Sequence, residues 1–174
     1  VTEGGYFINP ATGLFDPAHP EIAADAANPH RTAFGAIIAA LKARRAAGVE
    51  PFTVMSCDNL PGNGHVTKAA VTGLAAIRDP ALADWIAANV TFPNGMVDRI
   101  TPATGPRERE MAALFGLGDD PVPVTCEPFR QWVLEDNFPQ GRPAFEKVGV
   151  TLTPHVHNFE MMKIRILNGG HATI

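Results

Sequence analysis

Residues 51–77 read PFTVMSCDNLPGNGHVTKAAVTGLAAI, and this stretch decides the fold class. The short apolar run over 51–59 predicts a buried parallel strand, and the Pro- and Gly-bearing residues after it predict a turn. Apolar residues then recur at helical spacing, which predicts a helix over 65–77. Because strand, turn and helix in this order form the repeating unit of α/β proteins, the expected class is α/β.

The flanking segments continue this alternation. Before the stretch, residues 1–22 are rich in Gly, Pro, Asn and Asp and predict a strand followed by turns, and a helix is expected over 31–47 with Gly48 near its end. After it, the pattern predicts a helix at 80–89, a strand and turn within 89–100, a helix at 106–116 opened by Pro106, strands at VPVTCE (122–127), RQWVLED (130–136) and KVGVTLT (147–153), and a helix from Asn158 onward.

Composition excludes several classes of protein. The 174 residues are 45% hydrophobic and carry a net charge of -4, which is ordinary for a soluble globular domain. The one dense basic run, LKARRAAG (41–48), suits the C-terminal end of a helix, so no nucleic-acid partner is expected. No stretch approaches the roughly 20 apolar residues of a membrane span, and no leader opens the chain. Cys57 and Cys126 are far apart in the sequence, which favours reduced thiols over a disulfide framework. We therefore expect a cytoplasmic protein without a membrane partner.

The glycine-bearing turn PGNGHVT (61–67) invites comparison with a dinucleotide fingerprint. Gly62 and Gly64 fit G-x-G-x-x-G, but Thr67 holds the third position, and Asp79 is a weak candidate for the acid that follows. Phosphate binding here is therefore disfavoured. The turn is better interpreted as a loop bordering a site, with Asn59 at the carboxyl end of the expected strand, where ligands bind in open α/β sheets.

Two other kinds of chemistry find little support. His155 and His157 would share one face of a strand near Glu160, but no third strong ligand is apparent, so no metal is predicted. There is no Gly-x-Ser-x-Gly elbow and neither cysteine has a recognisable partner base, which argues against a nucleophilic hydrolase.

The terminal segment FEMMKIRILNGGHATI (159–174) is more informative. On a helix turning about 100° per residue, Lys163, Asn168 and His171 share a face about 140° wide. Gly169 and Gly170 lie among them, which suits close approach of a ligand. The alternative is a charged residue on a solvated face and two glycines that end the helix. The residues alone leave both interpretations open.

The chain resembles a known family. KIRILNGGH (163–171) is similar to the K-x4-N-x2-H active-site motif of the mannitol 2-dehydrogenase family of long-chain polyol-specific dehydrogenases and reductases. Similar motifs run along the chain in the family's order: VTEGGYFI, TVMSCDNLPGNGHVTKAAV, FPNGMVDRITPAT and CEPFRQWVLEDNFP. The resemblance covers essentially all 174 residues.

The resemblance implies a particular domain organisation. Residues 1–153 would form the later part of a Rossmann-like nucleotide-binding domain. Residues 154–174 would be the first helix of an α-helical substrate domain. The family's glycine-rich pyrophosphate turn would lie upstream of Val1 and most of the helical domain beyond Ile174, so the chain is expected to be a fragment of a monomeric enzyme.

The resemblance also implies residue roles. Lys163 would be the general acid/base, Asn168 and Asn59 would donate hydrogen bonds to the developing oxyanion, His171 would orient the substrate's hydroxyl groups, and Asp98 would help to bind substrate and set the electrostatics of the site. The cofactor would be NAD, with NADP as the alternative, without a metal. The substrate would be a polyol or its ketose, D-mannitol and D-fructose in the leading hypothesis. The alternatives are a fructuronate or tagaturonate reductase of the same family and a non-catalytic α/β binding module.

The proposed base poses a physical problem. Lysine has an unperturbed pKa of about 10.4, so it acts as a base near neutrality only when it is desolvated or placed beside another cation. Met161, Met162, Ile164 and Ile166 are candidates for desolvation, and Arg165 is a candidate cation. A Schiff base at Lys163 is chemically open, but the resemblance argues against it.

Overall fold

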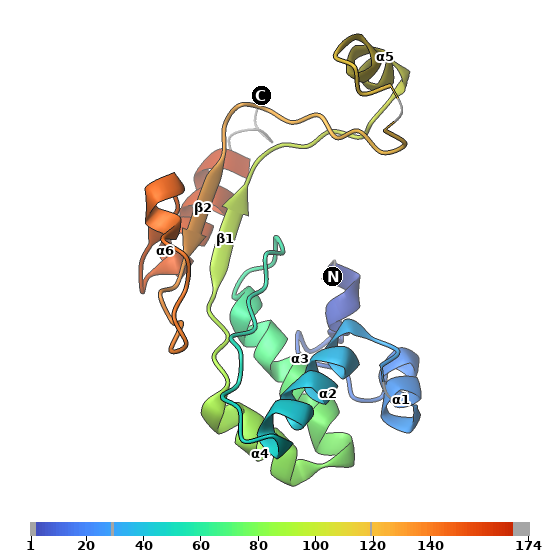
Figure 1. Ribbon diagram of the computed structural model, residues 1–174, viewed down its shortest axis with the longest axis vertical. Coiled ribbons are helices and arrows are strands. Elements are labelled where there is room, and N and C mark those ends of the chain that lie inside the picture. The colour runs from blue at the N-terminus through green and yellow to red at the C-terminus, as the bar shows by residue number, and fades with distance from the viewer. Residues whose placement is uncertain (1–2, 29, 119, 169–174) are drawn as a thin grey trace.

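The computed structural model describes residues 3–28, 30–118 and 120–168, with Glu3, Leu167 and Asn168 described by their backbone alone (Figure 1). The helices are η1 (Glu3–Tyr6, a 3-10 turn), α1 (Pro20–Ala27), α2 (Ala33–Ala46), α3 (Asn63–Arg78), α4 (Pro80–Asn89), α5 (Pro106–Leu114), η2 (Phe145–Val148, a 3-10 turn), α6 (Val156–Met162) and η3 (Lys163–Asn168, a π-helical turn). The strands are β1 (Gly95–Asp98), β2 (Gln131–Leu134) and β3 (Thr151–Leu152). None of the described helices has the length and apolar character needed to cross a membrane.

The first half of the chain forms a helical layer around α3. Helices α1, α2 and α4 pack against α3 and bury an apolar cluster that includes Ile22, Phe34, Leu41, Val71 and Ile86. The helices predicted at 31–47, 65–77, 80–89 and 106–116 are confirmed as α2, α3, α4 and α5. Local capping explains the boundaries: the Thr32 side chain accepts from Gly35 N–H at the start of α2, and Gly48 follows the helix with a left-handed φ of 66°.

The sheet lies beside this layer and carries a second, smaller core. Strand β1 pairs antiparallel with β2, from Gly95 opposite Leu134 to Asp98 opposite Gln131, and β2 pairs parallel with β3. Helix α6 covers these strands by burying Val156 and packing the partly buried Phe159 against Met96 and Val133. The strand predicted at 130–136 is confirmed as β2, and the mixed helix and sheet architecture fits the expected α/β class.

Three predicted strands are wrong in the described residues. Residues 51–59 form no ladder, because their backbone–backbone hydrogen bonding to a neighbouring segment is limited to Val54 N–H donating to the Thr91 carbonyl. Residues 122–127 form no strand, since Pro123 offers no N–H and the backbone–backbone bonding of the segment to its neighbour is limited to Glu127 N–H donating to the Ile100 carbonyl. The N-terminal segment forms a 3-10 turn at Glu3–Tyr6 in place of the predicted strand.

Smaller errors have local causes. The prediction missed α1, which starts at Pro20 with an unusual cap: the His19 side chain accepts from Glu21 N–H. The strand predicted over 147–153 shortens to Thr151–Leu152, because the chain turns at Gly149 with φ 92°.

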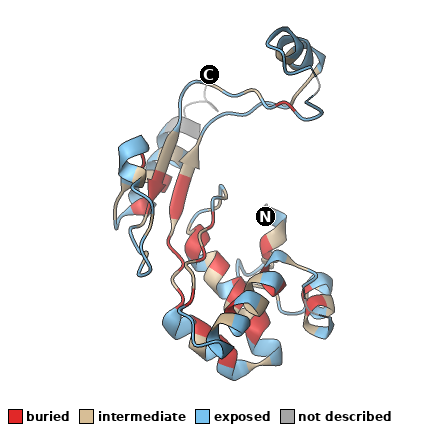
Figure 2. Ribbon diagram, in the orientation of Figure 1, coloured by how far each residue is buried: buried red, intermediate tan, exposed pale blue. Residues whose placement is uncertain are grey.

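A long arm, residues 99–118 and 120–130, leaves the sheet between β1 and β2 and carries α5 near its tip (Figure 1). No residue of α5 is buried (Figure 2), and Leu114 at its end and Phe115 directly after it are highly exposed. The two sides of the arm are joined by hydrogen bonds such as Glu127 N–H to the Ile100 carbonyl and Thr104 Oγ1 to the Pro123 carbonyl. The arm is thus ordered by its own bonds rather than by the core.

Candidate functional site

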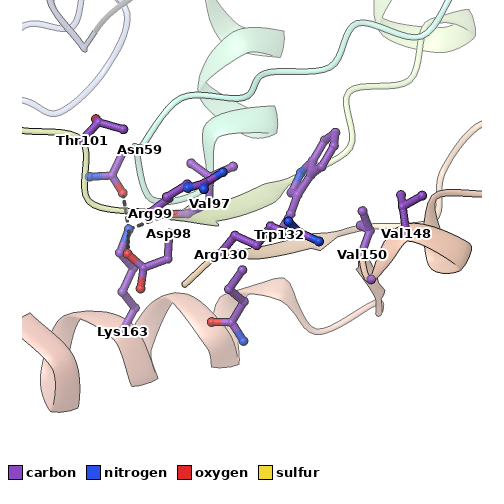
Figure 3. A pocket seen from close by; sticks show the side chains of 12 residues that line it. Asn59, Val97, Asp98, Arg99, Thr101, Arg130, Trp132, Val148, Val150 and Lys163 are labelled. Carbon is purple, nitrogen blue, oxygen red and sulfur yellow. Dashed lines mark hydrogen bonds and ion pairs between the residues drawn. The ribbon is translucent and has the colours of Figure 1, made fainter. Parts of the chain in front are cut away.

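Lys163 lies where three distant segments meet. Its Nζ donates to Asn59 Oδ1 at 2.9 Å and to the Val97 carbonyl at 2.7 Å, and it lies 3.5 Å from Asp98 Oδ1 (Figure 3). The lysine is the first residue of η3, directly after α6; the amide comes from the loop before α3, and the carboxylate from the end of β1. The structure therefore brings together three of the five predicted site residues, Lys163, Asn59 and Asp98.

The other two predicted residues fall at the C-terminal end. The backbone changes from α-helical to π-helical at Lys163, and Asn168 is the last residue of that π-helical turn. In a π-helical turn, backbone hydrogen bonds join residues i and i+5, which is also the sequence spacing of Lys163 and Asn168. The expected spacing of 100° per residue is therefore wrong here, since it applies to an α-helix. His171 lies outside the described residues.

The orientation of Asn59 follows from its partner. A lysine ammonium group has donors only, so the amide must present its oxygen to Nζ. The Asn59 Nδ2 group has no partner among the described residues, and Asn59 is exposed. An unpaired amide donor next to a lysine is the arrangement needed to bind a carbonyl or alkoxide oxygen.

Burial of the lysine has a different origin from the one predicted. The Lys163 and Asp98 side chains are only 12% and 10% exposed. Met162, Ile164 and Ile166, which were candidates for desolvation, are instead exposed on the helix surface, and Arg165 is exposed too. The loop bearing Asn59 and strand β1 shield the amine, and the nearest charge is the opposite charge of Asp98.

Asn63 holds the two sides of this site together, and the sequence reasoning missed it. Its side chain is fully buried, and its Nδ2 donates to the carbonyls of Asp58 and Gly95 at 2.9 Å each. Its Oδ1 accepts from Gly95 N–H at 2.9 Å. Asn63 therefore joins the loop that carries Asn59 to the strand that carries Asp98. A polar residue at the helix start of the PGNGH turn was the available signal.

The glycine-bearing turn serves packing rather than phosphate binding. The Asn94 side chain accepts from the N–H groups of Gly64 and His65, and Glu160 accepts from Gly62 N–H. These amides are therefore not free for a phosphate. A Cβ at Gly64 would overlap the Phe92 carbonyl oxygen, which explains the glycine. The weak candidate acid, Asp79, instead caps α4 by accepting from Leu82 N–H.

The two histidines near the last helix are not on a strand. His155 precedes α6 and His157 lies in its first turn, 3.5 Å from Glu160 Oε2 through Nδ1. Within the described ranges, no three His, Cys, Asp or Glu side chains gather as a metal site would require. The one-face strand arrangement that made a metal conceivable is therefore wrong.

A cavity of about 980 Å³ opens beside Lys163 (Figure 3). Its wall includes Asn59, Asp98 and Lys163, and it continues along the sheet past both ends of the arm to Trp132 and Val150. This volume is at the upper end of the range for small-molecule sites and has room for a sugar chain and a flat ring together.

Comparison with known proteins gives concordant matches. A family model described as the mannitol dehydrogenase Rossmann domain matches residues 1–147. A mannitol 2-dehydrogenase of Cereibacter sphaeroides is 74% identical over all of this chain, which covers 36% of that protein.

Two solved structures are also similar. A D-sorbitol dehydrogenase in substrate-free form has a TM-score of 0.91 at 51% identity, over 98% of this chain and 36% of that one. The ternary complex of Pseudomonas fluorescens mannitol 2-dehydrogenase with NAD and D-mannitol has a TM-score of 0.88 at 55% identity, over 98% and 35%. The chain thus spans about a third of the length of the relatives that it matches.

Proposed function

Because the chain belongs to the mannitol dehydrogenase family, we propose that the protein carrying it interconverts a polyol and a ketose, D-mannitol and D-fructose, by hydride transfer with NAD. The observation that carries the proposal is the position of Lys163. Its amine is held by Asn59, the Val97 carbonyl and Asp98 in the wall of a cavity that has room for the reactants.

The proposed mechanism assigns the proton to Lys163. During ketone reduction, negative charge builds on the carbonyl oxygen, and the Lys163 ammonium gives its proton to that oxygen. During alcohol oxidation, the neutral amine removes the hydroxyl proton. Asp98 lies 3.5 Å from the amine and stabilises its charged state between these steps.

Amide donors would stabilise the same oxygen. The Nδ2 group of Asn59 donates to it, because the Asn59 oxygen is already bound to Lys163. We assign the second donor to Asn168 and the orientation of the substrate's other hydroxyl groups to His171. Both assignments rest on the family's motif.

The described residues fit the reacting end of the cofactor better than its phosphates. The cavity beside Lys163 has room for a nicotinamide ring, whereas the amides of the 61–67 turn are bound by Asn94 and Glu160. A nicotinamide dinucleotide, when bound, supplies or accepts the hydride. No metal is assigned a role. We also propose residues 1–153 and 154–174 as parts of two domains, with the site between them, in a monomeric enzyme.

The test is substitution of Lys163 in a full-length protein that carries this sequence. Lys163→Ala is expected to lower kcat for fructose reduction by at least about a hundredfold, because general acid catalysis contributes about 10²–10⁴. Lys163→Arg is the matched control for charge: it keeps a cation beside Asp98, but arginine does not release its proton near neutral pH. We expect Lys163→Arg to be as inactive as Lys163→Ala. Wild-type turnover in either variant would remove Lys163 from the proposed role.

A further inference from the structure

The loop that carries Asn59 is positioned by side chains rather than by a ladder. Within the described part of the chain, residues 55–60 make no backbone–backbone hydrogen bond to a neighbouring segment. Asp58, the residue before Asn59, instead has both of its backbone polar groups bound by side chains. Its carbonyl accepts from Asn63 Nδ2 at 2.9 Å, and its N–H donates to Ser56 Oγ at 3.3 Å. The orientation of Asn59 therefore depends on Ser56 as well as on Asn63.

Ser56 is in turn fixed by Tyr6. The two hydroxyl groups are hydrogen-bonded at 2.7 Å, and Tyr6 and Ser56 are only 3% and 7% exposed. A serine side chain has three staggered positions, so a second partner is needed to hold its oxygen in one direction. The Tyr6 ring is itself held against Phe34, with the ring centroids 5.7 Å apart in the core of the helical layer. The helical layer thus fixes the direction of Ser56 Oγ.

These contacts form one continuous line from the helical layer to the lysine of the site. Tyr6 binds Ser56, Ser56 Oγ accepts from Asp58 N–H, Asp58 Oδ1 accepts from Asn59 N–H at 3.0 Å, and Asn59 Oδ1 accepts from Lys163 Nζ. A movement of the loop would lengthen the contact between Asn59 and Nζ and would turn the Asn59 Nδ2 group away from a reacting oxygen. An error of about 1 Å in such a position can lower a rate about a hundredfold.

We propose that Tyr6 and Ser56 are positioning residues for the reaction: their hydrogen bond holds the loop so that Asn59 meets both Lys163 and the reacting oxygen. This inference rests on the proposed function, since Asn59 stabilises a developing charge only if a ketone or alcohol oxygen reacts beside it. Neither Tyr6 nor Ser56 is in the wall of the cavity beside Lys163, so both act through Asn59 and not by touching the substrate. Their loss therefore lowers kcat, which depends on the transition state, more than it raises KM.

The experiment uses Tyr6→Phe in a full-length protein that carries this sequence, because phenylalanine keeps the ring and removes only the hydroxyl group. We expect kcat for fructose reduction to fall about tenfold, with KM changed less than about twofold; loss of the oxyanion donor itself should cost about 10²–10³.

Thr53→Val is the matched control. The Thr53 hydroxyl group is hydrogen-bonded to the Thr91 hydroxyl group at 2.9 Å and lies in the same extended segment as Ser56. No hydrogen bond among the described residues connects the Thr53 side chain to Asn59. We therefore expect kcat of this variant to stay within about twofold of wild type.

The same substitution in an Asn59→Ala background separates positioning from a general structural role. If Tyr6 acts through Asn59, Tyr6→Phe should lower kcat less than about twofold further in that background. Likewise, the double variant Tyr6→Phe/Ser56→Ala should be no slower than Ser56→Ala, because that serine substitution already removes the bond to Tyr6.

The contrary outcomes are distinct. An equal loss from Tyr6→Phe in both backgrounds would overturn the positioning role, since a loss that is independent of Asn59 reports damage to the fold. Unchanged kcat in Tyr6→Phe alone, or in Asn59→Ala, would overturn it as well and leave Lys163 in its role. Wild-type turnover of Lys163→Ala would instead overturn the proposed function.

Discussion

Tyr6 is the only tyrosine of the sequence, and its surroundings change its acidity. The ring is 3% exposed, and its hydroxyl group is hydrogen-bonded to Ser56 Oγ at 2.7 Å. Burial raises the pKa of Tyr6 above its ordinary value of 10.0. The Ser56 hydrogen bond lowers this pKa by less than burial raises it, and the negative charge of Asp58 adds a smaller increase. The folded state therefore favours the neutral phenol.

The raised pKa of Tyr6 predicts sensitivity to alkaline pH. A folded-state pKa above the unfolded value contributes stability that is complete below pH 10 and is lost as the pH rises through the folded pKa. We expect the tyrosinate absorbance, taken as the difference from Tyr6→Phe, to reach its midpoint above pH 10. The Tyr6→Phe variant should lose less stability than wild type between pH 9 and 11, because it has no phenol to ionise. A tyrosinate midpoint at or below pH 10 would contradict the buried environment of Tyr6.

At the scale of elements, the hydrogen bonds of the Asn63 side chain hold the site in place. It joins the start of α3 to the loop before it and to the first residue of β1. The same elements carry Asn59, Asp98 and the Val97 carbonyl that receive Lys163. A shift of this loop relative to β1 would separate the partners of the lysine, so stability and site geometry depend on one buried amide.

Replacement of Asn63 tests this dependence. Asn63→Ala leaves up to three buried backbone groups without partners, and each costs about 1–3 kcal/mol, so we expect about 2–4 kcal/mol of lost stability in urea unfolding. Asn89→Ala is the matched control, since the Asn89 amide donates to the Trp85 carbonyl at an exposed position. That variant should change stability by less than about 0.5 kcal/mol. Equal losses of stability in the two variants would show that the Asn63 side chain does not hold the loop and β1 together.

The same contacts explain what the sequence predicted well. Apolar periodicity and caps are local properties, so the helices at 31–47, 65–77, 80–89 and 106–116 are close to those observed. Strands need partners from distant parts of the chain, and the apolar run at 51–59 has a single backbone bond to its neighbour. A sequence pattern reports the tendency to be extended, not the presence of a ladder.

The features of the site likewise divide into those that were predicted and those that were missed. Asn59 and Lys163 are 104 residues apart, and only the family resemblance assigned both to one site, since no spacing rule relates such residues; their direct contact at 2.9 Å was not predicted. The π-helical turn at Lys163 was missed because helical periodicity assumes 100° per residue. Asn63 was missed because sequence alone does not distinguish a buried polar residue in a turn from an exposed one.

At the scale of the whole molecule, stability is unevenly distributed. The helical layer and the sheet each enclose buried apolar residues, whereas the arm carries a helix with none (Figure 2). The bases of the arm, Arg99 and Arg130, belong to the cavity wall, but its tip contacts neither core. Regions with few buried contacts open independently of the rest of a fold, so the arm should contribute little to global unfolding.

Shortening the arm tests this division. We would join Thr101 to Cys126 with a short Gly-Ser linker, which keeps Arg99, Arg130 and the hydrogen bond between Glu127 N–H and the Ile100 carbonyl. Because no residue of α5 is buried, the free energy of unfolding should change by less than about 1 kcal/mol. Ile86→Ala, at a fully buried position of the helical layer, should cost about 2–5 kcal/mol. A loss as large as that of Ile86→Ala in the shortened protein would mean that the arm stabilises the body through contacts that its exposed tip does not suggest.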